Sequence, residues 1–243
     1  MALALAVRSL RMDFGGVLAV DDVGFDVNEG EILGLIGPNG AGKTTFFNLV
    51  SGYLRPSRGS VSFFGRDVTG LPPYTLARLG ISRTFQVVRP FPRLTVLENV
   101  MVGAFLHDRD PRAAEARALE VLSLLGMDRY IASPASSLTL AARKRLEIAK
   151  ALALRPRVLL LDEVVAGLNP SEVAGTIEVI RGIRKSGVTI VIVEHILKVI
   201  MGLSDRVVVL DHGRKIAEGS PAEVSSNPEV ITAYLGSAED ADA

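Results

Sequence analysis

The stretch from Gly37 to Thr45, GPNGAGKTT, has the residue types and spacing of a loop that binds phosphate groups. Residues 37–44 fit the pattern G-x-x-x-x-G-K-[ST]. In this pattern glycines let backbone N–H groups wrap the phosphates, Lys43 reaches the outer phosphates and the Thr44 hydroxyl binds Mg²⁺. A chance match has odds of roughly one in a hundred at this composition, before a preceding strand and a following helix are demanded. The predicted phosphate loop consists of Gly37, Pro38, Asn39, Gly40, Ala41, Gly42, Lys43, Thr44 and Thr45.

Two acidic residues, Asp162 and Glu163, follow the apolar run 158–161. A strand of a parallel sheet delivers its carboxyl end to the ligand crevice. Asp162 could therefore hold Mg²⁺ through water while Glu163 faces a nucleophilic water. Taken alone, such a run is often only a strand leaving the core. Together with the phosphate loop, it predicts a catalytic pair.

Three further residues have weaker signals. His195 ends the strand pattern VTIVIVEH and would emerge at the same sheet edge, although a lone His at a strand end is more often structural. Gln86 ends the pattern ISRTFQ, where it could touch Mg²⁺ and sense the nucleotide. Phe14 could stack on a purine, but a half-buried strand aromatic is the commoner alternative.

Predicted strands and helices, recognised by the spacing of their apolar residues, must position these side chains. Residues 1–36 have strand and turn patterns, and residues 32–36 are apolar throughout, as in a buried central strand. A helical pattern starts at Thr44, and strands are predicted at 59–68 and 81–86. Helical patterns then replace strands from about Val87 to Arg155. Two strong strands, a helix over 171–185 between them and a hairpin over 206–219 follow. This order predicts one α/β core with a mainly parallel sheet and an inserted helical lobe.

Composition excludes several classes of protein. With 48% hydrophobic and 22% charged residues, the 243-residue chain is globular and can bury a large core. Its 27 basic and 27 acidic residues give a net charge of zero, so no long-range attraction to the negative charge of nucleic acid is expected, and we expect no nucleic-acid partner. The absence of cysteine excludes disulfides and thiolate chemistry. The opening MALALAV is too short for a signal core, and no apolar run approaches the ~20 residues of a membrane helix, so a cytosolic chain is expected.

Taken in this order, these motifs resemble the nucleotide-binding subunit of ABC transporters over essentially the whole chain. The resemblance implies a P-loop NTPase (RecA-like) α/β core with an N-terminal antiparallel β subdomain and an inserted helical subdomain. Residues 1–87 and 156–243 would form the core and 88–155 the lobe. It also implies an ATP hydrolase that uses ATP and Mg²⁺. GPNGAGKTT matches the family's Walker A motif and VLLLDE its Walker B.

The resemblance assigns roles to single residues. Glu163 is expected to be the general base, His195 the switch histidine at the γ-phosphate and Gln86 the Q-loop residue. Lys43 and Gln86 join the catalytic set, and the expected metal ligands are Thr44, Gln86 and Asp162. Phe14 takes the place of the aromatic that stacks on adenine.

The family signature, usually Leu-Ser-Gly-Gly-Gln, is altered here. The chain has Leu138 followed by Thr139, Leu140, Ala141 and Ala142. In the family this segment begins a helix and grips the ATP held by the opposite subunit. A hydroxyl and backbone N–H groups at a helix start meet that requirement, and Thr139 and Ala141 keep them. We therefore expect a working but weaker grip across a homodimer or a heterodimer with a sister ATPase.

Segments in the C-terminal part of the chain indicate one branch of this family. The segments AGLNP, EHILKVIMGLSDRVVVLDHGRKIAEGSP and NPEVITAYLG resemble the ATPases of branched-chain amino-acid importers. Such a subunit would lie peripherally on the cytoplasmic face of the inner membrane. It would work with two permease subunits and, indirectly, a solute-binding protein.

Three alternatives remain open at this point. Lipopolysaccharide-export ATPases share much of this tail, so lipid export competes with import. An ABC protein acting on ribosomes or DNA usually has two ATPase halves or a long arm, and neither is present in this chain. A phosphotransferase would need an acceptor pocket, which no segment suggests.

Overall fold

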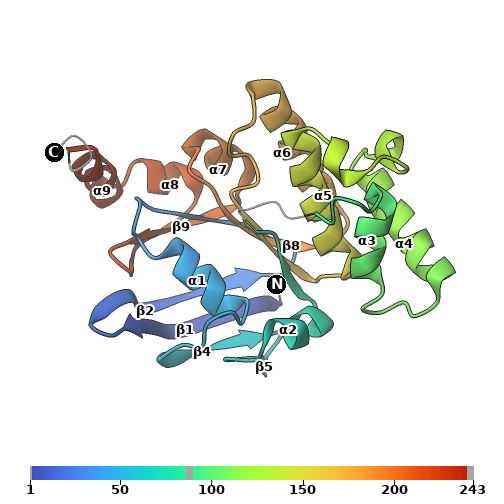
Figure 1. The fold of residues 1–243 in the computed structure, drawn as a ribbon. Coiled ribbons are helices and arrows are strands. Elements are labelled where there is room, and N and C mark those ends of the chain that lie inside the picture. The colour runs from blue at the N-terminus through green and yellow to red at the C-terminus, as the bar shows by residue number, and fades with distance from the viewer. Residues whose placement is uncertain (1, 86–89, 240–243) are drawn as a thin grey trace. The chain divides into compact units, whose positions relative to one another are not determined.

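The computed structural model describes residues 2–85 and 90–239, which form two compact units. One unit contains residues 1–76 and 189–243, and the other contains residues 77–188. Each unit has its own strands, helices and buried apolar side chains, and Figure 1 labels all the α-helices and several of the strands.

An antiparallel sheet lies in the first unit. It contains β1 (Leu3–Phe14), β2 (Val17–Asn28), β4 (Arg58–Phe63) and β5 (Arg66–Asp67), in the order β2-β1-β4-β5. β1 pairs antiparallel with both β2 and β4. The inward side chains of β1 form the apolar face of this sheet, since Val7 and Leu10 are fully buried. The predicted N-terminal antiparallel β subdomain is thereby confirmed.

Parallel strands form the centre of the first unit. β3 (Ile32–Ile36) pairs in parallel with β8 (Thr189–Val193) and with β9 (Arg206–Asp211). β10 (Arg214–Gly219) returns antiparallel to β9, which confirms the predicted hairpin. Every residue of β3 and β8 is buried, as expected of parallel strands covered on both faces.

Helices of the first unit pack closely on these strands. They are α1 (Lys43–Val50), α7 (Leu197–Leu203), α8 (Pro221–Ser225) and α9 (Pro228–Glu239). The short helix α2 (Pro73–Leu79) follows β5 and includes residues of both units. A Cβ on Gly34 of β3 would lie 2.7 Å from Ile200 Cγ2 and 2.7 Å from Ser204 Oγ. Glycine at position 34 therefore lets α7 approach β3 directly.

The second unit has two parallel strands and a set of helices. β6 (Ile81–Arg83) pairs in parallel with β7 (Val158–Asp162). The helices are α3 (Val96–Ala104), α4 (Pro111–Leu124), α5 (Leu140–Ala153) and α6 (Pro170–Lys185), with 3₁₀ turns at Asp128–Tyr130 and Ala135–Ser137. β6 ends at Arg83 and is shorter than the predicted strand 81–86.

Helix packing in the second unit also depends on one glycine. A Cβ on Gly103 of α3 would lie 2.7 Å from the carbonyl oxygen of Lys150 on α5. Glycine at position 103 therefore lets the two helices approach each other closely.

The start of α3 is fixed by a capping box between Thr95 and Glu98, in which each side chain accepts a hydrogen bond from the backbone N–H of the other residue. The predicted helical segments between 88 and 155 are present as α3, α4 and α5.

The second unit is wider than the predicted lobe, because it also includes β6, β7 and α6. The lobe boundaries at 88 and 155 stay a prediction. Among the described residues, no helix combines the length and the apolar character needed to cross a bilayer.

Candidate functional site

The predicted phosphate loop forms the turn between β3 and α1. β3 ends at Ile36, and α1 begins at Lys43. Gly42 is the N-cap of α1, with φ 97° and ψ 2°, a left-handed conformation that glycine adopts readily. The first N–H groups of a helix have no intrahelical partner, and the helix dipole adds positive potential there. The loop therefore has the strand–turn–helix geometry that suits an anion.

Glycines of this loop meet two different requirements. A Cβ on Gly37 would lie 2.1 Å from the carbonyl oxygen of Leu210, and a Cβ on Gly42 would lie 2.4 Å from the carbonyl oxygen of Ala19. These glycines let neighbouring backbone approach the loop. Gly40 has φ 79°, and a Cβ there would meet no described heavy atom within 4 Å. Space at Gly40 is thus open, and only its conformation calls for glycine.

Lys43 lies against its own loop. Its side chain is buried, and Nζ donates to the carbonyl oxygens of Gly37 and Pro38, at 2.7 Å each. The next residue, Thr44, is exposed, so its hydroxyl is accessible to a ligand or a cation. Contact between Lys43 and a phosphate would exchange these carbonyl acceptors for phosphate oxygens.

Tyr234 of the C-terminal helix α9 bonds to the same loop. Burial raises the pKa of the Tyr234 phenol above its ordinary value, and a hydrogen bond with the backbone of Gly37 acts in the opposite direction. This contact joins residues almost two hundred positions apart. Sequence reasoning missed Tyr234, because nothing in the local pattern of α9 points to the loop.

Phe14 and His195 also belong to the first unit. Leu35 of β3 is paired in register with Val193 of β8. Gly37 and His195 each lie two residues further on, so both leave the sheet at the same edge, as predicted. His195 is exposed. Phe14 ends β1 with its side chain 47% exposed, so it is not a core residue.

Asp162 in the second unit is held by a buried ion pair. Its carboxylate lies 2.9 Å from Arg83 Nη2, and the two side chains are only 6% and 7% exposed. The Asp162 N–H donates to the Thr84 hydroxyl at 3.0 Å. Arg83 Nε donates to the Thr84 carbonyl at 3.2 Å, and its guanidinium lies over the Phe85 ring. The carboxylate is thus fixed at the end of β7 by the neighbouring strand β6.

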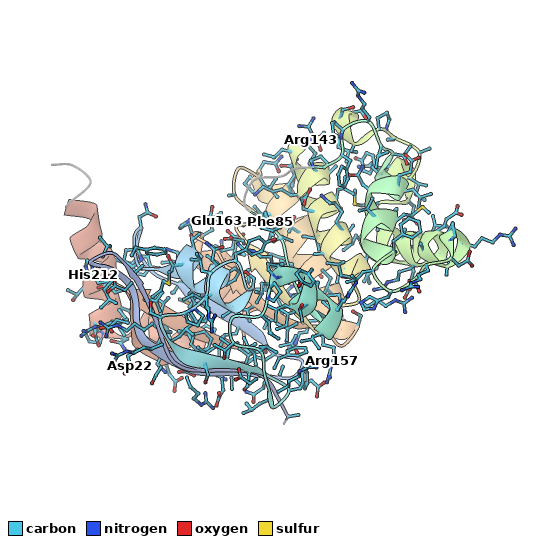
Figure 2. All side chains as sticks on the ribbon, turned by 60° about the horizontal axis from the view of Figure 1, so that its bottom comes forward. Asp22, Phe85, Arg143, Arg157, Glu163 and His212 are labelled. Carbon is cyan, nitrogen blue, oxygen red and sulfur yellow. The ribbon has the colours of Figure 1, made fainter. Side chains whose placement is uncertain are left out.

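Glu163 follows in an unusual backbone conformation. Its φ is 50°, in the left-handed region that non-glycine residues rarely occupy. The buried Lys144 of α5 donates from Nζ to the Glu163 carbonyl oxygen at 2.6 Å. Glu163 and Phe85, both labelled in Figure 2, line a small cavity of about 10 Å³. Its lining residues are Thr84, Phe85, Lys144, Glu147, Asp162, Glu163 and Val164.

The altered signature forms the start of α5. Thr139 is the N-cap, and its hydroxyl accepts a hydrogen bond from the Ala142 N–H at 3.3 Å. Thr139 and Leu140 are exposed, whereas Ala142 is buried. Leu140 lies near the segment after Glu163, since a Cβ on Gly167 would lie 3.3 Å from Leu140 Cδ2. Thr139 therefore provides the helix-start hydroxyl that the sequence predicted.

The predicted residues fall into two groups, one in each unit. The loop residues 37–45, Phe14 and His195 belong to the first unit, and Asp162, Glu163 and the signature belong to the second. Gln86 lies outside the described residues, so its assigned role stays a prediction. Sequence reasoning also missed Arg83 and Lys144. Lys144 lies between Arg143 and Arg145, and such a basic cluster is typical of a solvated helix face, so the sequence contained no signal for its burial.

Comparisons with known proteins agree with this geometry. Residues 20–166 match the family model described as ABC transporter, and residues 214–240 match the model described as branched-chain amino acid ATP-binding cassette transporter. The chain is 42% identical to the high-affinity branched-chain amino acid transport ATP-binding protein LivG of Salmonella typhimurium, with 96% of this chain and 98% of that protein covered. It is 39% identical to BraF of Pseudomonas aeruginosa, a protein with the same description, at the same coverage.

Solved structures show the same fold. A nucleotide-free ATP-binding cassette from an ABC transporter superposes with a TM-score of 0.88 at 30% identity, covering 96% of this chain and 98% of that one. The ADP conformation of such a cassette has a TM-score of 0.89 at 30% identity, covering 97% and 100%.

Proposed function

Since this chain belongs to the ABC transporter ATP-binding family, we propose that it is the ATP-hydrolysing subunit of an importer for branched-chain or related amino acids. The observation that carries the substrate class is its 39–42% identity, over 96% of its length, to proteins named for branched-chain amino acid transport. The match of residues 214–240 to a branched-chain transporter model supports the same branch.

The proposed reaction is attack of water on the γ-phosphorus of ATP, with cleavage of the bond to the bridging oxygen. Lys43 and the backbone N–H groups of the loop would neutralise phosphate charge, and His195 would contact the γ-phosphate. Glu163 would take a proton from the attacking water. Phe14, with its exposed ring, would stack on the adenine.

Magnesium fits the donors that the chain offers. The exposed Thr44 hydroxyl and the Asp162 carboxylate are oxygen ligands of the kind Mg²⁺ prefers. When bound, Mg²⁺ would offset negative charge on the phosphates. Asp162 is already ion-paired with Arg83, which supports contact through a water rather than directly. Gln86 is the third proposed ligand.

We propose that two such cassettes close head to tail on two ATP molecules. Thr139 and Leu140 are exposed at the start of α5, where they could meet the nucleotide of an opposite subunit. The partner cassette would be a second copy or a sister ATPase. Two integral membrane permease subunits, served by a solute-binding protein, would complete the importer, and this chain would lie peripherally on the cytoplasmic face of the membrane.

The proposal is tested by replacing the parent protein with Glu163→Gln as the only copy in the cells that normally make it. We expect uptake of labelled leucine, isoleucine and valine to fall to background, while the purified variant still binds ATP. Carboxyl-to-amide replacement removes the base and preserves the shape of the side chain. Undiminished ATP hydrolysis in the variant would show that Glu163 is not the general base.

The same cells separate import from export. Normal uptake of all three amino acids, together with loss of lipopolysaccharide from the cell surface, would indicate that the chain powers lipid export and not amino-acid import. Loss of uptake with a normal surface would support import.

A further inference from the structure

A buried ammonium group contacts the backbone of the proposed general base. Lys144 is 8% exposed, and its Nζ lies 2.6 Å from the Glu163 carbonyl oxygen. Burying a lysine charge is costly unless hydrogen bonds compensate it, and a charge-assisted bond to a carbonyl is among the stronger ones. The Ala166 N–H reaches the same oxygen at 3.4 Å. The Glu163 carbonyl is thus anchored from α5 and from its own loop.

The anchored residue is conformationally strained. Glu163 has φ 50°, a conformation that costs a non-glycine residue free energy and persists only where the surroundings impose it. The backbone of Glu163 sets the direction in which its carboxylate leaves the chain. A contact that fixes the Glu163 carbonyl therefore also limits where the carboxylate can lie.

Lys144 belongs to the helix that begins with the altered signature. α5 starts at Leu140 with Thr139 as its N-cap, so Lys144 lies little more than one turn from the predicted trans-contact residues. The same helix thus carries the residues expected to grip a partner's ATP and the ammonium that contacts Glu163.

We infer that Lys144 is a positioning residue for ATP hydrolysis. Its ammonium holds Glu163 in the left-handed backbone conformation and so couples the position of the first turns of α5 to the orientation of the general base. The inference rests on the proposed role of Glu163. It gives the signature helix a direct contact with the catalytic strand end of its own subunit.

The test compares three variants of the full chain. Lys144→Met removes the ammonium and keeps an unbranched stem, whereas Lys144→Arg restores a cationic donor. Lys150→Met is the matched control, because Lys150 is another α5 lysine and pairs with Glu147 at 2.9 Å. We expect Lys144→Met to lower kcat about 10- to 100-fold with KM within about twofold. Lys144→Arg should recover part of kcat, and Lys150→Met should stay within about twofold of the parent chain.

Two further readouts separate positioning from general damage. If Lys144 acts through Glu163, Lys144→Met causes no further loss of residual turnover in a Glu163→Gln background. A merely structural role would lower turnover by the same factor in both backgrounds. Hydrogen exchange of the amides at residues 163–166 should be faster in Lys144→Met and unchanged in Lys150→Met.

Each outcome is decisive. An unchanged kcat and unchanged exchange in Lys144→Met, or equal losses in both backgrounds, would overturn the inference and leave the proposed function standing. If Glu163→Gln alone hydrolyses ATP normally, the proposed role of Glu163 fails, and the coupling fails with it. Where turnover of the purified chain is too slow to compare, the exchange rates decide.

Discussion

The buried ion pair between Arg83 and Asp162 predicts a large loss of stability in Arg83→Met. Both side chains are almost fully buried, at 7% and 6% exposure, and their charged atoms are 2.9 Å apart. Removing one partner of a buried pair leaves a charge in a poorly hydrated place, which costs about 3–5 kcal/mol. Methionine can still fill the space of the arginine stem. We therefore expect the free energy of unfolding to fall by about 3 kcal/mol near neutral pH.

A second substitution tests whether the carboxylate charge causes the loss. Asp162→Asn in the same variant removes the charge and should recover about 2 kcal/mol.

Urea unfolding followed by circular dichroism near neutral pH measures these differences. Arg181→Met is the control, because Arg181 pairs with Glu178 at 2.7 Å in the same unit but with 47% and 70% of the side chains exposed. Its loss should stay below about 1 kcal/mol. Equal losses for Arg83→Met and Arg181→Met, or no recovery with Asp162→Asn, would refute the argument that burial makes the loss of the Arg83–Asp162 pair costly.

Two other predictions concern the loop and the interface. Gly42→Ala should lower the midpoint of thermal unfolding far more than Gly40→Ala, because its Cβ would lie 2.4 Å from a backbone oxygen while Gly40 has open space. Gly40→Ala should cost only the left-handed penalty of about 1–2 kcal/mol, and a larger loss there would contradict the geometry. Light scattering on Glu163→Gln should show a doubled mass when Mg-ATP is added, if Thr139 and its neighbours grip nucleotide across an interface. A monomer that binds ATP would instead indicate that a sister ATPase is the required partner.

Local sequence patterns were sufficient for the main elements. The apolar run 32–36 predicted a central strand because burial on both faces leaves no alternation, and the G-x-x-x-x-G-K-[ST] spacing located the turn before α1. The helix start at Thr139 was implied by the resemblance to the family, whose signature begins a helix, and the structure confirms the cap by its hydroxyl.

Contacts between distant segments could not be predicted in the same way. Arg83 and Asp162 are 79 positions apart, and only the pairing of β6 with β7 brings them together. The glycines of the loop were assigned to phosphate binding, but Gly37 and Gly42 also admit backbone from β9 and β2. The strain at Glu163 had no signal at all, because glutamate is not a residue that favours a left-handed conformation.

The pairing of β3 has a consequence for how the chain folds as it is synthesised. β3 lies near the N-terminus, but both of its neighbours, β8 and β9, come from residues 189–211. The second unit is one continuous segment, 77–188, so β6 and its partner β7 are synthesised within one stretch of chain. The first unit must wait with an apolar strand exposed until most of the chain has emerged, and long-range pairing of this kind is slow. The strand that leads into the phosphate loop is thus among the first to be made and among the last to be completed.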